Sequence, residues 1–428
     1  MQKYFFFLLL ATHLTLASAQ QAKVEMKQNP HLSANGYFAY PGPLQKQLTP
    51  APKGYAPFFL SHYGRHGSRY LIGARAYDHP FATLQTADSL GKLTLLGKET
   101  LRKVALIRTE AHLRDGELTQ RGAEQHRQIA ERMYRRFPEI FRGATNIDAK
   151  STTVIRCILS MENALQQLIK LNPQLKIRHD ASQHDMYYMN QSDRQLDAMK
   201  MNDAAKAAYE PFAKRHDNYE GVMKRLFNDE NYWRHSIDAS AFNDQLYNLA
   251  SNVQSTELRH SLSLFDIFTA DELYDLWQKT NAWWYINFGP SPLNGGLQPY
   301  SQRNLLRKII AEADSCIALP HPGATLRYGH DTMVMPLTCL LNINGYGQQI
   351  EDLEQLDDKN WLDYRIFPMA CNLQFVFYRS KAHPDDILVK VLQNENEAEL
   401  PIKTDVAPYY HWNDFKAYCF KILDAYRQ

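Results

Sequence analysis

The sequence predicts an α/β fold in which a mostly parallel sheet is flanked by helices and interrupted by an inserted helical cap. Short apolar, β-prone runs end near residues 64, 156 and 329, and a polar cluster lies at the end of each run. Helical patterns separate these runs, and strands that alternate with helices form parallel sheets. Residues 186–299 instead carry long charged helical patterns with few strand-like runs, which predicts the cap.

The composition is that of a folded globular chain. Of its 428 residues, 44% are hydrophobic and 22% are charged. Lys and Arg number 48 and Asp and Glu number 46, so the net charge of +2 excludes a basic nucleic-acid binder, and we expect no nucleic-acid partner. The five cysteines are widely spaced without a CxxC motif, which indicates neither a disulfide framework nor a structural zinc site.

The first half of the core is expected to be strand, helix, strand. Residues 58–63 form an apolar run closed by Gly64, as is typical of parallel-sheet strands. Residues 122–136 have helical spacing, and Thr119 is the expected N-cap. A second strand is expected over residues 146–156, because it contains the β-branched residues Thr152, Thr153, Val154 and Ile155.

The second half of the core follows a Gly/Pro-rich break at residues 289–296. A helix is expected over residues 301–313, and strands are expected over residues 324–328, 372–379 and 387–392. The resulting division is an extended, Pro-rich segment over 20–55, an α/β core from 56–185 and 300–428, and the cap over 186–299.

The N-terminus has the pattern of a secretory signal peptide. Lys3 supplies a positive charge, residues 4–11 are apolar, and Ala17-Ser18-Ala19 provides the small residues of a cleavage site. The apolar run is shorter than the ~20 residues that span a bilayer. We therefore expect cleavage near Ala19, export to the periplasm or the extracellular space, and no membrane span.

The strongest chemical pattern is Arg65-His66-Gly67-Ser68-Arg69, at the end of the first strand. Ligands bind at the carboxyl ends of parallel strands, and glycine lets the backbone approach a ligand closely. Guanidinium groups match phosphate oxygens, and a neutral imidazole nitrogen can attack phosphorus to give a covalent intermediate. The alternative is a surface basic cluster around a hydrogen-bonded histidine.

Two further patterns lie at the ends of other expected strands. In Gly329-His330-Asp331-Thr332, His330 could bind phosphoryl oxygens and Asp331 could protonate a leaving alkoxide. The alternative is that Asp331 caps a helix and His330 is structural. In the run from Ser151 to Arg156, Arg156 could be a third phosphate clamp or a solvated strand-end arginine.

Taken together, these patterns resemble the histidine acid phosphatases, a branch of the histidine phosphatase superfamily. The resemblance rests on Arg-His-Gly-x-Arg at residues 65–69, Ser-Thr-x-x-x-Arg at residues 151–156 and Gly-His-Asp at residues 329–331, in that order. Looser similarity at residues 65–70 and 369–373 suggests the phytase and multiple inositol polyphosphate phosphatase group. The resemblance covers residues 55–180 and 300–400, and it implies a phosphoglycerate mutase-like core.

The resemblance also implies a role for each site residue. His66 would be the nucleophile that forms a phosphohistidine, and Asp331 would be the general acid. The transferring phosphate would be bound by Arg65, Arg69, Arg156 and His330. The substrate would be a small phosphomonoester, inositol phosphates included, and neither a metal nor another cofactor is required. Where many inositol polyphosphate phosphatases carry His-Ala-Glu, this chain has His330-Asp331-Thr332, which is closer to the acid phosphatase and phytase pattern.

Other interpretations of the same residues stay open. A mutase or transferase would use the same histidine, and a non-catalytic phosphate binder would need only the clamps. His62 and His66 have a metal-ligand spacing for a helix, but Gly64 and the preceding strand argue against a zinc site. The cap offers cations that could reach the pocket mouth or face solvent: Lys200, Lys206, Lys214, Arg215, Lys224 and Arg225.

Overall fold

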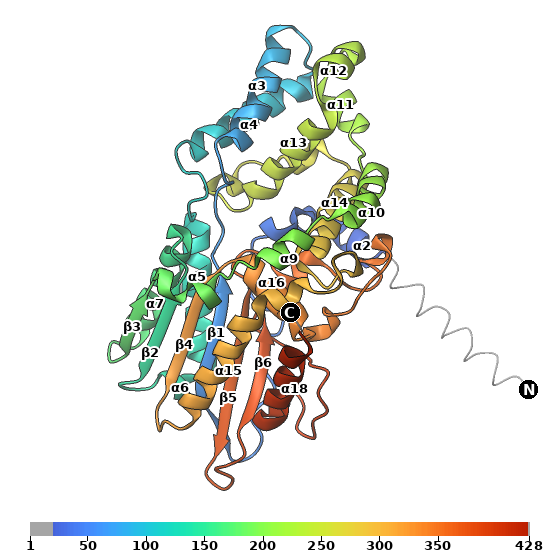
Figure 1. Cartoon of the computed structure of the whole chain (residues 1–428). Helices are drawn as coiled ribbons and strands as arrows, with labels where there is room; N and C mark the ends of the chain where they lie inside the picture. The colour runs from blue at the N-terminus through green and yellow to red at the C-terminus, as the bar shows by residue number, and fades with distance from the viewer. Residues whose placement is uncertain (1–19, 427–428) are drawn as a thin grey trace, which may run out of the picture.

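The computed structural model describes residues 20–426, and the expected signal peptide lies outside the described residues. An eight-stranded sheet forms the lower half of the molecule, and a group of helices forms the upper half (Figure 1). The strand order is β3-β2-β4-β1-β5-β6-β7, with β8 paired to β6. The predicted α/β fold with flanking helices is therefore confirmed.

The parallel part of the sheet consists of β1 (Tyr55–Arg65), β2 (Asn146–Ser151), β3 (Lys176–Asp180) and β4 (Gly323–Gly329). In the register of this part, Arg65 lies opposite Gly329, and Ser151 lies opposite Tyr328. The carboxyl ends of β1, β2 and β4 therefore meet at one edge of the sheet.

The other part of the sheet is antiparallel. It contains β5 (Asn372–Ser380), β6 (Leu388–Gln393), β7 (Asn396–Glu397) and β8 (Tyr409–His411). β5 runs antiparallel to β1 and pairs Gly64 with Asn372, so the start of β5 reaches the same edge of the sheet. The sheet is mixed, with its parallel strands gathered where the sequence patterns lie.

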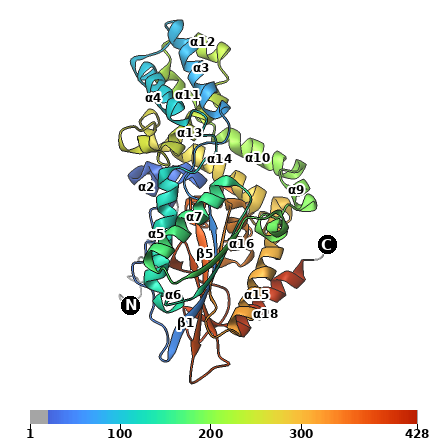
Figure 2. The same ribbon diagram turned by 90° about the vertical axis from the view of Figure 1, so that its left-hand side faces the viewer.

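Helices cover both faces of the sheet (Figure 2). On one face, α5 (Gln120–Arg136), α6 (Pro138–Phe141) and α7 (Ile155–Leu171) pack on a core that includes Leu60 and Leu326. On the other face, α15 (Arg303–Ile317), α16 (Asp331–Leu340) and α18 (Trp412–Ala425) pack on Phe59 and Phe375. The neighbours Phe59 and Leu60 point to opposite faces, as alternation along a strand requires.

A separate hydrophobic core joins the upper helices. It unites residues of α3 (Arg75–Ser89) and α4 (Leu95–Ala111) with residues of α11 (Glu220–Leu226) and α13 (Ala239–Val253). The predicted cap begins at residue 186, so helices from the predicted core (α3 and α4) and from the predicted cap (α11 and α13) share one hydrophobic core. The remaining α-helices are α2 (Gln21–Gln28), α8 (Met186–Met189), α9 (Arg194–Met199), α10 (Asp203–Arg215), α12 (Glu230–Ser236), α14 (Ala270–Phe288) and α17 (Asp363–Ile366).

Three sequence expectations need correction. The 20–55 segment is extended only in its later part, since α2 and a 3-10 helix (Pro30–Tyr37) precede it. Packing explains this difference, because α2 buries Ala22 and Met26 against aromatic residues of α14 and α17. The strand expected over 146–156 ends at Ser151, and α7 begins at Ile155. One of the long helical patterns expected in the cap is divided, because α9 ends at Met199 and Asn202 caps a separate helix, α10.

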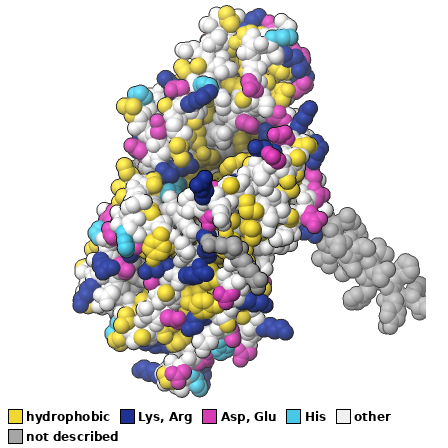
Figure 3. All heavy atoms as spheres, in the orientation of Figure 1, with side chains coloured by type: hydrophobic (Ala, Val, Ile, Leu, Met, Phe, Trp, Pro, Cys, Tyr) yellow, Lys and Arg dark blue, Asp and Glu magenta, His cyan; other side chains and the backbone are white. Residues whose placement is uncertain are grey.

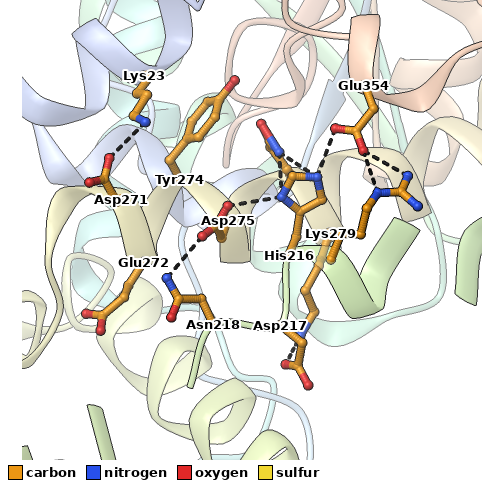
Figure 4. A network of polar contacts seen from close by, with 12 residues as sticks. Lys23, His216, Asp217, Asn218, Asp271, Glu272, Tyr274, Asp275, Lys279 and Glu354 are labelled. Atoms are coloured by element: carbon orange, nitrogen blue, oxygen red, sulfur yellow. Dashed lines mark hydrogen bonds and ion pairs between the residues drawn. The ribbon is translucent and has the colours of Figure 1, made fainter. Parts of the chain in front are cut away.

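A polar network joins α10, α14 and the 3-10 helix Leu353–Gln355 (Figure 4). His216, which follows α10, contacts Asp275 through Nδ1 at 3.0 Å and Glu354 through Nε2 at 2.9 Å. Burial lowers the pKa of His216, but the two carboxylates more than offset burial, so the net pKa is raised. When it is protonated, His216 therefore forms ion pairs that connect the end of α10 to α14 and to the 3-10 helix Leu353–Gln355.

Two observations concern the expectations about a membrane span and about disulfides. Within residues 20–426, no helix is long and apolar enough to cross a bilayer. All five cysteines carry free thiols.

Candidate active site

The loop that follows β1 lies at the carboxyl edge of the parallel strands. The backbone N–H of His66 donates to the carbonyl of Gly329 at 2.8 Å, and the carbonyl of His66 accepts from the N–H of Ala370 at 3.0 Å. These bonds hold His66 between the end of β4 and the segment before β5. Figure 3 shows the molecule hollowed between the upper helices and the lower half, with Lys or Arg and His side chains at the lower rim of the hollow.

Glycine is required where this loop crosses the start of α5. A Cβ atom on Gly67 would lie 2.3 Å from the carbonyl oxygen of Gly122, so the two backbones are in direct contact. The N–H of Gly67 donates to Ser160 Oγ at 3.1 Å, and the N–H of Ser68 donates to Gln125 Oε1 at 2.8 Å. Helices α5 and α7 thus fix the loop from one side.

The imidazole of His66 has a defined tautomer. Its Nδ1 lies 2.9 Å from the carbonyl oxygen of Gly67, an acceptor, so Nδ1 carries the proton and Nε2 keeps its lone pair. The side chain is buried, and burial lowers the pKa of His66 well below its usual value, with further lowering by Arg65, Arg156 and Arg69. A neutral imidazole with a free Nε2 is the form that acts as a nucleophile.

Three arginines surround His66. Arg65 is buried, and its Nη1 donates to the carbonyls of Gly36 at 2.6 Å and Phe367 at 2.8 Å. Arg69 donates to its neighbouring carbonyl at residue 70 and lies 5.3 Å from the ring centre of Tyr37. Burial and then repulsion by Arg69 lower the pKa of Arg156. Convergent cations suit an oxyanion ligand.

His330 and Asp331 complete the cluster at the start of α16. The ring of His330 is 5.8 Å from that of His66, and its Nε2 lies 3.2 Å from Thr152 Oγ1. Burial is the main cause that lowers the pKa of His330 to about 4. Asp331 Oδ2 pairs with Arg65 Nη2 at 2.6 Å. Burial raises the pKa of Asp331, but Arg65 above all outweighs burial, so the net pKa is below the usual value.

All six predicted site residues therefore lie at one edge of the sheet, with one difference in their placement. Arg156 belongs to the first turn of α7, whereas the sequence predicted it at the end of a strand. Two further residues of the site were not predicted from the sequence: Thr152, which contacts His330, and Cys157, whose thiol donates to the carbonyl of Gly329 at 3.3 Å. Thr152 lies within the Ser-Thr-x-x-x-Arg pattern and Cys157 directly follows it, so this pattern could have indicated both residues.

The other candidate residues have environments of their own. His62 is buried, its ring centre is 5.2 Å from that of Tyr328, and burial lowers its pKa to about 3. Within residues 20–426, no group of three or more His, Cys, Asp or Glu side chains could hold a metal ion. Most of the cap cations pair with acids: Lys200 with Asp197, Arg215 with Glu354, Lys224 with Glu220 and Arg225 with Glu272. Lys206 and Lys214 are exposed.

Comparisons with known proteins agree with the geometry. Residues 64–394 match the model of the histidine phosphatase superfamily (branch 2). A search of curated proteins finds no match. Among solved structures, the multiple inositol polyphosphate phosphatase of Bifidobacterium longum, in complex with inositol hexasulfate, has a TM-score of 0.73 at 19% identity, over 90% of this chain and 96% of that chain. The phytase of D. castellii has a TM-score of 0.66 at 14% identity, over 92% of this chain and 85% of that chain. Apo Hafnia alvei phytase has a TM-score of 0.53 at 16% identity, over 87% of this chain and 98% of that chain.

Proposed function

The chain belongs to branch 2 of the histidine phosphatase superfamily and is a phosphatase, and from this premise we propose that it hydrolyses phosphate monoesters through a phosphohistidine on His66. The observation that carries the proposal is the hydrogen bond from Nδ1 of His66 to the carbonyl of Gly67, which leaves Nε2 unprotonated beside three guanidinium groups. A phosphate binder would need the guanidinium groups but not an oriented, neutral imidazole.

The first chemical step forms a phosphorus–nitrogen bond. Nε2 of His66 attacks phosphorus, the ester oxygen departs, and the carboxylic acid of Asp331 gives its proton to that oxygen. Arg65, Arg69 and Arg156, with His330, would bind the other phosphoryl oxygens and stabilise their charge. The low pKa of His66 keeps the imidazole neutral in acid, so the nucleophile is available under conditions in which carboxyl groups hold protons.

Asp331 has to take up a proton from solvent when the substrate binds. In the free protein, the pairing with Arg65 keeps Asp331 ionised. A phosphate dianion competes for Arg65 and places negative charge next to the carboxylate, and both effects raise the pKa of Asp331. In the second step, water attacks phosphorus and gives a proton to the Asp331 carboxylate. The bond to Nε2 then breaks, and inorganic phosphate is released.

The substrate proposed is a small phosphomonoester, with inositol phosphates as the first class to test. Support comes from two neighbours in fold, an inositol polyphosphate phosphatase and a phytase. We further propose that residues 1–19 are a signal peptide and that the enzyme is exported. The predicted cap, 186–299, shares a hydrophobic core with α3 and α4. Together with these two helices it would act over the rest of the core formed by 56–185 and 300–428 and select the leaving group.

Phosphate release from p-nitrophenyl phosphate and inositol hexakisphosphate, with EDTA present, tests this proposal. Release by the wild type that disappears in His66→Ala, while Arg178→Gln at an exposed site retains it, is the expected result. Transfer of the phosphoryl group to another hydroxyl without free phosphate would identify a mutase or transferase instead. Phosphate binding without turnover by folded wild type would identify a binding protein.

A further inference from the structure

A second cleft, distinct from the candidate active site, lies beside the first turns of α5. It has a volume of about 750 Å³ and is walled by residues 29–41, by α5 and by residues 254–260. None of the six candidate active-site residues lines it. Its volume is within the range of sites that hold small molecules.

The walls of this cleft carry more cations than acids. Arg121 and Arg127 come from α5 and Arg259 from the 254–260 segment, whereas the acids are Glu124 and Glu257. Both acids already have cationic partners, since Glu124 pairs with Arg127 at 2.8 Å and Glu257 pairs with Arg259 at 2.7 Å. The cleft therefore holds one arginine in excess of its acids.

The excess cation is Arg121. Its Nη1 donates to the backbone carbonyl of Gln254, and no carboxylate of the described residues lies within 4.0 Å of its guanidinium. Burial is the main cause that lowers the pKa of Arg121 to about 10, repulsion by Arg259 adds to it, and attraction by Glu257 offsets part of this lowering. A partly buried guanidinium that contacts no carboxylate and is repelled by a second guanidinium would be stabilised by an anion that binds to both.

Two glutamine side chains give the cleft a fixed floor. Gln254 accepts from the N–H of Ala39 at 3.0 Å, and its amide donates to the carbonyl of Ser251 at 3.1 Å. Gln125 accepts from the N–H of Ser68 at 2.8 Å, and its amide donates to the carbonyl of Tyr40 at 3.2 Å. The arginines are therefore presented from a hydrogen-bonded surface. The same surface contacts the loop that carries His66.

From this cleft we infer a second anion site in which Arg121 and Arg259 bind a phosphate group, either free or carried on a polyol. Arg121 and Arg259 line the same cleft. Two guanidinium forks can together bind one tetrahedral oxyanion. The ligand belongs to the chemical class that the proposed reaction consumes and releases. No step of that reaction requires this site, so the two proposals fail independently.

Calorimetric titration of a variant with a weakened active site tests this inference. Arg69→Gln removes a clamp at the active site, and inositol hexasulfate is a polyanion without phosphate esters to hydrolyse. On the Arg69→Gln background, we expect saturable binding of this probe that weakens at least about tenfold on adding Arg121→Gln or Arg259→Gln. The addition of Arg178→Gln, which removes an exposed arginine elsewhere, should leave the affinity unchanged.

Titrations with inorganic phosphate and with inositol hexasulfate distinguish the two forms of the ligand. Binding of inorganic phosphate without binding of inositol hexasulfate assigns the site to free phosphate, and the converse assigns it to a polyanionic polyol. Absence of binding of both probes to Arg69→Gln overturns the inference. Binding that is equally strong in the Arg121→Gln and Arg259→Gln proteins also overturns it, because the arginines then do not form the site.

Discussion

Replacement of Gly67 by alanine tests whether the contact with α5 positions the loop that follows β1 and carries His66. The new Cβ would lie 2.3 Å from the carbonyl oxygen of Gly122 and 2.6 Å from the carbonyl carbon and the Cα atom of the same residue. These are backbone atoms, so no side-chain rotation relieves the overlap. To restore an ordinary contact of 3.4 Å, the loop and α5 must separate by about 1 Å.

This separation has two measurable consequences. His66 is next to the substituted residue and would move with the loop, away from Arg156 and His330 on neighbouring elements. A displacement of about 1 Å in a catalytic geometry costs roughly 10²-fold in rate. Overpacking of a close contact costs about 1–3 kcal/mol of stability. We therefore expect Gly67→Ala to lower kcat about a hundredfold and to lower Tm.

The assay is kcat with p-nitrophenyl phosphate, together with Tm from thermal unfolding. Ser68→Ala is the matched control, because the Ser68 hydroxyl is buried and has no hydrogen-bond partner among the described residues. We expect Ser68→Ala to stay within about twofold of the wild type. Wild-type kcat and Tm in Gly67→Ala would refute the argument that this contact positions His66.

Three further predictions follow from the site and the polar network. Asp331→Asn should reduce kcat roughly 10²–10⁴-fold for alkyl phosphates and less for p-nitrophenyl phosphate, whose leaving group needs less protonation; equal losses would contradict an acid role. Thr152→Val should raise KM for the substrate more than it lowers kcat, because His330 loses its contact at Nε2; an unchanged KM would count against this contact. His216→Gln should lower Tm more at pH 5 than at pH 8, and an equal loss at both pH values would exclude the ion pairs of His216. The sign follows because the raised pKa of His216 gives a stabilisation that is complete below the unfolded-state pKa and lost as pH rises through the folded-state pKa.

The sequence predicted that these six residues lie together, because its signals are local. Each of the patterns at residues 65–69 and 329–331 follows a short apolar strand, and parallel pairing brings the ends of such strands to one edge. The register that places Arg65 opposite Gly329 therefore needs no information beyond strand identity and direction.

The errors arose where tertiary contacts override local preference. The β-branched residues 152–155 favour a strand, but pairing with β4 stops at Ser151, and the chain turns into α7. As a result, Arg156 reaches the site from a helix. The pairing of Arg65 with Asp331 joins residues far apart in sequence. Two cap cations, Arg215 and Arg225, also pair with acids on other elements, which no sequence periodicity encodes.

The most direct test of the account is to trap the phosphoryl-enzyme. Wild-type protein is mixed with radiolabelled p-nitrophenyl phosphate and quenched rapidly in base, and the labelled peptide is identified. We predict an acid-labile, base-stable label on His66 that forms and decays at rates consistent with turnover, and no label in folded His66→Ala. A label on another residue, or turnover by the wild type without any phosphoryl-enzyme on His66, would contradict the central claim.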